Sequence, residues 1–175
     1  MKLKSKWPVR RFFAFLGALY LFCAVTPLLF AESGTTKSES VFRIYDTATE
    51  TVRTVNDLDF LCGALPCEMA VSAPDEALKA QVIAIHTLYD RKRRENTGKD
   101  FDFTCDSAEK SIYTTDAGLT DEEQNRVRAL CLSVLDKEIY FENEPINACY
   151  FAISAGCTQP FENVWPEKSY PYLTA

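Results

Sequence analysis

The chain has 175 residues, of which 47% are hydrophobic and 25% are charged, and these ordinary globular values exclude disorder and collagen-like repetition. Five of its 19 Lys and Arg residues fall in residues 1–31, so residues 32–175 hold 14 basic against 25 acidic residues, a net charge of −11. A domain this acidic lacks the clustered cations that neutralise phosphate, which excludes nucleic acid as an expected partner.

Residues 1–31 have the composition of a targeting segment. Their basic residues are followed by an uncharged apolar run over residues 12–30, which as a helix would span about 29 Å, roughly one bilayer core. The run predicts either an uncleaved membrane anchor or a signal peptide cleaved after Ala31, and its length favours the anchor. In both cases the basic flank stays in the cytoplasm, so we expect the remaining chain on the extracytoplasmic side, anchored or secreted.

The polar residues 32–40 predict a tether that leads into one domain over residues 41–175. This domain begins with a predicted β-hairpin. Residues 41–45 and 51–55 are rich in β-branched side chains and roughly alternating, and residues 46–50 form a turn between them.

Two helices are expected next. Asn56 is a suitable N-cap for a short helix that Pro66 would end. The second helix covers residues 74–96 and is preceded by a capping box formed by Ser72 and Asp75.

The second helix is predicted to be central, because its apolar residues surround nearly its whole circumference. Its last turns, residues 90–95, are charged and expected in solvent. His86 is the only histidine of the chain, and we expect a hydrogen-bonded core or helix-edge residue rather than the partner of a nucleophile. The main apolar stripe consists of Leu78, Val82, Ile85 and Tyr89.

A loop is expected until Thr120, which forms a capping box with Glu123 and opens a third helix. Residues 138–141 and 146–153 then predict a strand pair about a short turn. Helices and strands do not follow a regular βαβ order, so we predict an α+β domain in which a central buried helix packs against short antiparallel hairpins and a second capped helix. The predicted core face of the third helix is Val127, Leu130, Cys131 and Val134.

Seven cysteines are present, and Cys23 lies in the apolar run. The remaining even number permits disulfides in an exported chain, but no CxxC pair occurs, and with a single histidine a zinc site is not expected. We expect several buried free thiols rather than a full disulfide framework. The six cysteines beyond the apolar run are Cys62, Cys67, Cys105, Cys131, Cys149 and Cys157.

Glu68 is the strongest candidate for a catalytic group. It is the only charged residue between Phe60 and Pro74, and no Walker loop, GxGxxG, HExxH or GxSxG motif competes with it. Apolar neighbours would desolvate its ionised form and raise its pKa toward values at which a carboxyl donates a proton near neutral pH. The alternative is a glutamate that caps a helix or points into solvent.

Glu68-Met69, followed by a PxEALKAQ segment over residues 74–81, resembles the signature of the stage II sporulation protein D family. The family pattern reads EMP and then WPxEALKAQAVAARTY, and His86 stands where the family usually has Arg. The family comprises exported lytic transglycosylases of the bacterial cell wall, related to amidase enhancers. Further matches follow in order at residues 103–106, 145–150, 154–158, 163–165 and 171–173, so that the resemblance covers about residues 41–175.

The resemblance implies that Glu68 protonates the oxygen between N-acetylmuramic acid and N-acetylglucosamine and then takes the proton of the muramyl C6 hydroxyl, which closes a 1,6-anhydro ring. It implies no cofactor, a substrate of peptidoglycan glycan strands without stem peptides, and a cell-wall amidase as partner. Lys79 is expected either to bind the glycan or to pair with Glu76. Aromatic stacking on sugars could come from Tyr150, Tyr113 or Trp165. The expected glycan-binding residues are Lys79, Gln81, Tyr150, Ser154, Gly156 and Thr158.

Two departures from the family pattern matter. Glu109 and Lys110 stand where some members carry a second cysteine and a histidine, so no metal is expected at Cys105. Family members usually continue beyond the position of Ala175, which suggests a truncated product with an incomplete domain. Three functions stay open: a lytic transglycosylase, a non-catalytic glycan-binding module that enhances an amidase, and an inactive truncation.

Overall fold

The chain divides into two units, Met1–Ser38 and Glu39–Ala175, and every helix and strand discussed below belongs to the second. No helix within the described part of the chain is long and apolar enough to cross a membrane. Apart from Phe13, the anchor predicted over residues 12–30 lies outside that part. The computed structural model describes Phe13 and residues 40–153, 156–167 and 169–174.

The predicted hairpin is confirmed. β1 (Val41–Asp46) pairs antiparallel with β2 (Thr51–Asn56) from end to end. A third strand, β3 (Phe103–Cys105), pairs parallel with the other edge of β1, giving the order β2-β1-β3. β3 lies where a loop was expected, because three residues are too few to show a strand pattern. The α+β class is confirmed, but the main sheet is mixed rather than a set of antiparallel hairpins.

α2 (Asp57–Glu68) begins at Asn56 as predicted, since the Asn56 side chain accepts a hydrogen bond from the backbone N–H of Asp59. The predicted end at Pro66 is wrong, because the helix continues to Glu68. A proline in the last turn removes only one backbone hydrogen bond. The fully buried Leu65 holds this turn in the core, and its carbonyl accepts a hydrogen bond of 3.0 Å from the N–H of Met69.

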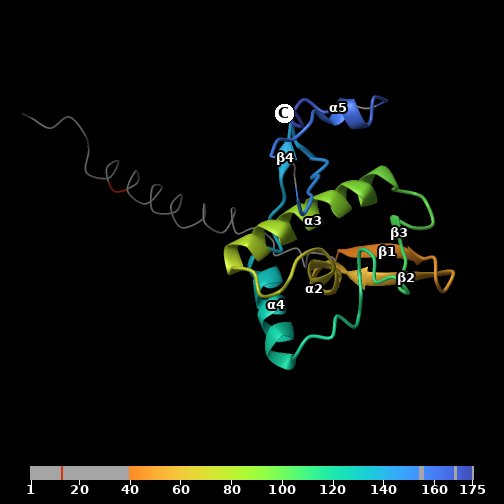
Figure 1. Ribbon diagram of the computed structural model, residues 1–175, viewed down its shortest axis with the longest axis vertical. Helices are drawn as coiled ribbons and strands as arrows, with labels where there is room; N and C mark the ends of the chain where they lie inside the picture. The colour runs from red at the N-terminus through yellow and green to blue at the C-terminus, as the bar shows by residue number, and fades with distance from the viewer. Residues whose placement is uncertain (1–12, 14–39, 154–155, 168, 175) are drawn as a thin grey trace, which may run out of the picture. The chain divides into compact units, whose positions relative to one another are not determined.

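α3 (Asp75–Glu95) is the central helix. It lies between α2 and the sheet on one side and, on the other, a hairpin of β4 (Tyr140–Phe141) and β5 (Glu144–Pro145) (Figure 1). The predicted stripe is buried, and none of residues 81–93, all of which are described, is exposed. The predicted capping box is wrong: Pro74 is the N-cap, and Asp75 instead binds Arg126. The helix begins two residues later than a box on Ser72 requires, and Pro74 has no side-chain hydrogen-bond acceptor.

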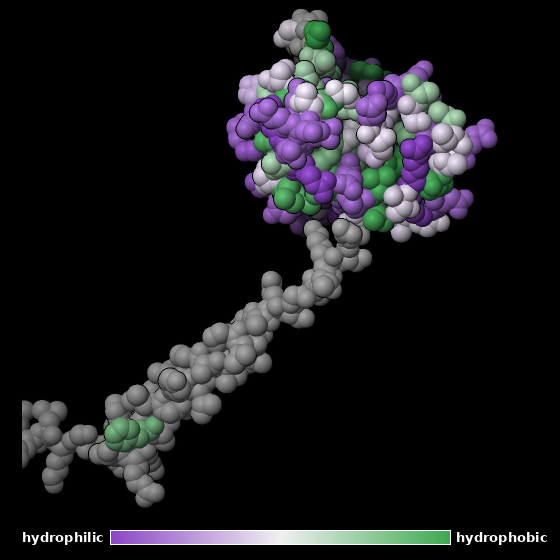
Figure 2. Space-filling view, turned by 90° about the horizontal axis from the view of Figure 1, so that it is seen from below, coloured by the Kyte–Doolittle hydropathy of each residue, from purple (hydrophilic) through white to green (hydrophobic). Residues whose placement is uncertain are grey.

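α4 (Asp121–Ser133) has the predicted capping box, in which Thr120 accepts from the N–H of Glu123 and the Glu123 carboxylate accepts from the N–H of Thr120. Its predicted core face is buried as well. On the face of the domain that Figure 2 shows, hydrophilic residues predominate and hydrophobic residues lie in small groups.

The C-terminal part has less regular structure. β4 (Tyr140–Phe141) and β5 (Glu144–Pro145) form a two-rung hairpin, and the predicted strand over residues 146–153 is absent from these described residues. Pro145 explains the early end, because it has no N–H with which to extend the ladder. One further backbone bond of 3.0 Å joins Ile146 to Ile139. A short helix, α5 (Phe161–Val164), follows.

An aromatic cluster holds the sheet and the helices together. Phe60 of α2 lies 4.8 Å from Phe42 of β1 and 5.0 Å from Tyr89 of α3, measured between ring centroids. Tyr89 lies 4.5 Å from Phe103 of β3. Such edge-on and tilted pairs each contribute about 0.5–1.5 kcal/mol beyond their buried area. The cluster therefore fixes α2 on α3, and with it the position of Glu68.

Candidate active site

Glu68 is the last residue of α2, and its side chain is exposed. The predicted dehydrated carboxyl is therefore not found in the free protein. α2 reaches the edge of the core at this turn: Leu65 is fully buried, whereas Pro66 and Cys67 are only half-buried. Apolar neighbours in the sequence thus pack into the core and leave the carboxylate in solvent.

The Glu68 carboxylate interacts with the hydroxyl of Tyr150, a residue far along the chain. Burial raises the pKa of Tyr150, and the charge of Glu68 and a hydrogen-bonding contact with its carboxylate raise it further. Tyr150 is half-buried against the core. The structure therefore brings together two of the residues that the sequence had singled out, one from each end of the domain.

The charge of Glu68 also acts on Tyr89 and Lys92 of α3. Burial raises the pKa of Tyr89, and the charge of Glu68 adds to this rise. Burial lowers the pKa of Lys92, while Glu95 and Glu68 act in the opposite direction. The Lys92 ammonium lies 4.5 Å from the Tyr89 ring centroid, a cation–π contact. Sequence reasoning missed Lys92 because it lies in a run of charged residues that was expected to be solvated.

Beside Tyr150 lies a groove of about 500 Å³, built by residues 149–174 and called the aromatic groove below. Thr158, another predicted glycan-binding residue, lines it together with Trp165. Trp165 stacks on Phe161 with 4.6 Å between ring centroids. The aromatic residues that line the groove are Tyr150, Phe151, Phe161, Trp165 and Tyr172.

The other predicted site residues lie elsewhere. Lys79 forms the alternative ion pair with Glu76, at 2.7 Å, and lines a separate cavity between α3 and the end of α4. Gln81 is half-buried on α3, and its amide nitrogen has no hydrogen-bond partner among the described residues. Gly156 is exposed with a φ of 101°. Ser154 lies outside the described residues.

Tyr113, predicted as a possible stacking residue, packs in the core instead. Its ring stacks on Phe60 at 5.8 Å between centroids. It also covers Gly63, where an added Cβ would lie 2.5 Å from the ring and 2.4 Å from the Thr114 carbonyl oxygen. This contact holds the loop before α4 against α2.

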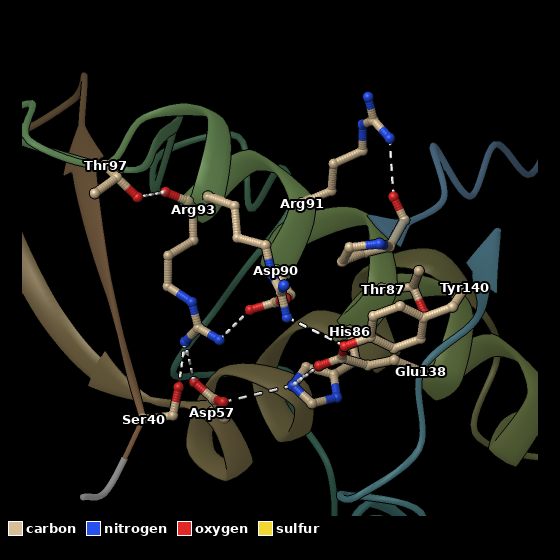
Figure 3. Close-up of polar contacts among 12 residues, drawn as sticks. Ser40, Asp57, His86, Thr87, Asp90, Arg91, Arg93, Thr97, Glu138 and Tyr140 are labelled. Atoms are coloured by element: carbon tan, nitrogen blue, oxygen red, sulfur yellow. Dashed lines mark hydrogen bonds and ion pairs between the residues drawn. The ribbon is translucent and has the colours of Figure 1, made fainter. Parts of the chain in front are cut away.

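A buried charge cluster at the C-terminal end of α3 connects this end to the β4–β5 hairpin (Figure 3). Asp90 is only 2% exposed and accepts hydrogen bonds from Arg93 and Arg94. Arg93 also binds Asp57 at 3.0 Å, and Arg94 donates to the Tyr140 hydroxyl at 3.1 Å. The expectation that residues 90–95 are solvated is wrong for Asp90, which points inward and turns the arginines onto neighbouring elements, whereas Arg94 and Glu95 are exposed.

His86 is buried as predicted, but it is not hydrogen-bonded. Its Nε2 lies 3.5 Å from Asp57 Oδ2 and 3.7 Å from Glu138 Oε1, and neither ring nitrogen has a hydrogen-bond partner in the described structure. Burial alone would raise the pKa of Asp57, yet the interactions with His86 and Arg93 outweigh it and hold this pKa below its ordinary value. In Figure 3 the imidazole lies between the two carboxylates.

The sequence model of the Stage II sporulation protein family, SpoIID, matches residues 45–134, about half of the chain. The chain belongs to the SpoIID family. It is similar to stage II sporulation protein D of Bacillus subtilis (strain 168), with 26% identity over 140 residues, and to that of Bacillus amyloliquefaciens, with 27% identity over 140 residues. These alignments cover 74% of this chain and 40% of each relative, so the chain spans about 40% of the length of the curated relatives it matches.

The SpoIID match divides the candidate site. Glu68, Tyr89 and Lys92 lie inside the matched residues 45–134, whereas Tyr150 and the aromatic groove lie beyond them. Among the described residues no group of three or more His, Cys, Asp or Glu side chains is placed to hold a metal ion. Cys105 is buried on β3 and its thiol is free.

Proposed function

We propose that this SpoIID chain is a peptidoglycan lytic transglycosylase in which Glu68 is the general acid and base. The observation that carries the proposal is the position of the Glu68 carboxylate beside the Tyr150 hydroxyl, because Tyr150 also lines the aromatic groove. Tyr150 is thus next to two features at once. One is a carboxyl that could transfer a proton, and the other is a groove that could hold sugar rings.

The aromatic groove is suited to a glycan strand. Its volume of about 500 Å³ falls in the range of small-ligand sites. Trp165 and Phe161 offer flat apolar faces for the carbon faces of sugars, and Thr158 offers a hydroxyl. A strand bound there, with its scissile bond over Tyr150, would cover Glu68 and displace water from its carboxyl. Such desolvation favours the protonated acid that the first step needs.

In the proposed reaction, protonated Glu68 donates its proton to the glycosidic oxygen as the bond from C1 of N-acetylmuramic acid breaks. The resulting carboxylate then accepts the proton of the C6 hydroxyl, whose oxygen attacks C1 and closes the 1,6-anhydro ring. Since no water is activated, the second carboxylate of ordinary glycoside hydrolysis is not required. Tyr150 would orient the Glu68 carboxyl, and the Lys92 charge would stabilise its ionised state between the two steps.

The test is digestion of peptide-free glycan strands with the purified full chain, followed by mass spectrometry for anhydro-muramyl ends. Glu68→Gln should lower the rate at least about 100-fold, as expected for loss of a general acid and base. Glu122→Gln, at an exposed position of α4, is the matched control and should retain full activity. Equal product from the Glu68→Gln protein would remove Glu68 from the mechanism.

Tyr150→Phe separates orientation from binding. The variant keeps the ring that lines the groove and loses only the hydroxyl that contacts Glu68. We expect kcat to fall about 10-fold or more while KM for the glycan changes little. A rise in KM with unchanged kcat would instead make Tyr150 a binding residue without influence on Glu68.

A second function is supported by the exposure of Glu68, which lacks the dehydrated pocket of a preformed acid. In this alternative the chain is a non-catalytic glycan-binding module that enhances a cell-wall amidase. It predicts that the wild-type chain binds glycan and stimulates the amidase, yet yields no anhydro product, and that Glu68→Gln changes neither property. Both functions place the domain outside the cell membrane, anchored or secreted through residues 1–31. Protease digestion of intact cells would test that location.

A further inference from the structure

Two cysteines from different helices meet beside a cavity that the proposed function does not use. Cys62 of α2 is half-buried, and Cys131 of α4 is fully buried. Cys62 lines a cavity of about 420 Å³ together with Val127 and Arg128 of α4. Cys131 follows those two residues by one helical turn, so its side chain lies on the same face of α4, against α2.

Each of the two thiols influences the pKa of the other, and their surroundings differ. A hydrogen bond from Cys131 lowers the pKa of Cys62; burial opposes this shift, and the charge of Arg128 assists it. The same hydrogen bond, followed by burial, raises the pKa of Cys131. Arg128 is held in place by Asp59, whose carboxylate accepts a hydrogen bond of 2.8 Å from it. Cys62 lines the cavity whereas Cys131 is fully buried, so Cys62 is the thiol that an external reagent can reach.

Cys67 shows that this setting is not common to cysteines of α2. It is also half-buried, but its Sγ donates to the Gly63 carbonyl oxygen at 3.3 Å. Burial and the charge of Glu68 raise the pKa of Cys67, with a small opposing effect of Lys110. Cys67 is thus a built-in comparison on the same helix.

We propose that Cys62 and Cys131 are a redox-active dithiol that closes to a disulfide between α2 and α4. The oxidant is a disulfide of the glutathione or thiol–disulfide oxidoreductase class, RSSR. The Cys62 thiolate attacks one sulfur of RSSR, forming a mixed disulfide and releasing RS⁻. The Cys131 sulfur then attacks Cys62 Sγ and releases the second RS⁻. The two thiol protons end on two RSH molecules, and the protein has lost two electrons.

The cavity gives a small disulfide access to Cys62, and closure of the dithiol would link two helices. It is lined by Cys62 on one side and by the loop over residues 113–119 on another, so a small disulfide can reach Cys62 but not the buried Cys131. Closure would tie α2, which carries Glu68, to α4. The inference is independent of the proposed function, because it concerns Cys62 in the middle of α2 and a separate cavity, and it needs no glycan.

The test is oxidation of the reduced full chain with glutathione disulfide, followed by alkylation of the remaining thiols and tryptic mapping. Cleavage at Lys and Arg places Cys62 and Cys67 in the peptide 54–79 and Cys131 in the peptide 129–137. We expect these two peptides to be joined in the wild-type and Cys67→Ser chains and separate in the Cys62→Ser chain. Joining that persists in Cys62→Ser, or no joined peptide in the folded wild type, would overturn the proposal.

Two further measurements guard against misfolded variants. Oxidation should raise the Tm of the wild type and of Cys67→Ser by roughly 10 °C, because the link closes a long loop, and leave that of Cys62→Ser unchanged. In the reduced chain at pH 8, iodoacetamide should modify Cys62 several-fold faster than Cys67, and Arg128→Gln should reduce that difference. Equal rates for Cys62 and Cys67 in the wild type would contradict the assignment of Cys62 as the nucleophile.

Discussion

The two regions of the domain that flank Val134 are built in different ways. Residues 41–134 have long capped helices, a three-stranded sheet and a continuous apolar core. Residues 135–174 have two-residue strands and one helical turn, and they expose large apolar side chains such as Phe151 at 63% and Ile153 at 89%. The first region is stabilised by a continuous buried core, whereas the second is held by smaller aromatic contacts and by polar bonds to α3.

That attachment is visible in a few specific contacts. Arg91 donates to the Pro145 carbonyl at 2.8 Å and lies over the Tyr170 ring, and the N–H of Ile139 donates to Thr87 at 2.9 Å. The candidate active site lies at this junction: Glu68 comes from the first region, and the groove comes from the second. The difference indicates that a stable scaffold positions the acid while a less regular segment supplies the substrate surface.

The largest expected effect is at the centre of the first region. Phe60→Ala would remove a fully buried ring that contacts Phe42, Tyr89 and Phe103, and we expect a loss of about 3–5 kcal/mol in the free energy of unfolding. Urea denaturation followed by circular dichroism would measure it. Ile153→Ala in the second region should change the same quantity by less than about 0.5 kcal/mol. Comparable losses in both variants would show that the two regions share one core.

A smaller effect is expected where the regions are attached. Asp90→Asn would remove the buried charge that orients Arg93 and Arg94, and we expect a loss of about 1–3 kcal/mol, since both arginines retain partial access to water. Because Arg94 then loses its orientation toward Tyr140, chymotrypsin should cut sooner at Tyr140 and Phe141. The Glu122→Gln variant, at an exposed position of α4, is the control. If Asp90→Asn is cut at the wild-type rate, the cluster is not what attaches the hairpin.

The sequence predicted the first region better than the second for a physical reason. Asn56 and the Thr120–Glu123 capping box work through neighbours three residues away, so local sequence determines them, and both are confirmed. The stripe of α3 is likewise a local periodicity. The predicted helix end at Pro66 and the predicted cap at Ser72 were wrong because other contacts override the local preference. The burial of Leu65 does so in the first case and the N-cap Pro74 in the second.

The site itself was only partly predictable. Glu68 was found from its apolar neighbours and its motif, but its exposure depends on where α2 leaves the core, which no local pattern shows. The contact of Glu68 with Tyr150 joins residues far apart in the chain. Lys92 and Asp90 were missed because a run of charged residues usually indicates solvent, and only the packed structure reveals that Asp90 turns inward.

The pH dependence of the Tm would test the contribution of the buried Asp46 carboxyl on β1, within the first region. Hydrogen bonds from Ser107 lower the pKa of Asp46 to about 2, against the cost of burial. Because this pKa is depressed, the stabilisation is fully present above about pH 4 and is lost as pH falls toward 2. The Tm of the wild type should therefore fall over this window, and Asp46→Asn should show a weaker dependence there. Asp100→Asn, at an exposed loop position, should follow the wild type. If the Tm of Asp46→Asn falls with pH as much as that of the wild type, other carboxyls cause the acid sensitivity.

The smallest effect on stability, and the most informative about function, is expected at Trp165. It is 47% exposed and stacks on Phe161 at the wall of the aromatic groove. Trp165→Ala should lower the free energy of unfolding by about 1 kcal/mol or less, because about half of the ring is in solvent and its stacking partner Phe161 lies in the second region. It should nevertheless weaken binding of peptide-free glycan about tenfold, since a stacked ring contributes on the order of 1 kcal/mol or more.

Leu132→Ala provides the matched control for Trp165, because Leu132 is a large apolar residue, 59% exposed, on α4 rather than in the groove. Isothermal titration of glycan strands and thermal melting would be measured on the same protein preparations. Loss of glycan binding without loss of Tm in Trp165→Ala alone would assign substrate recognition to the second region. If both variants bind like the wild type, the aromatic groove is not the glycan surface, and the position of Glu68 beside Tyr150 loses its functional meaning.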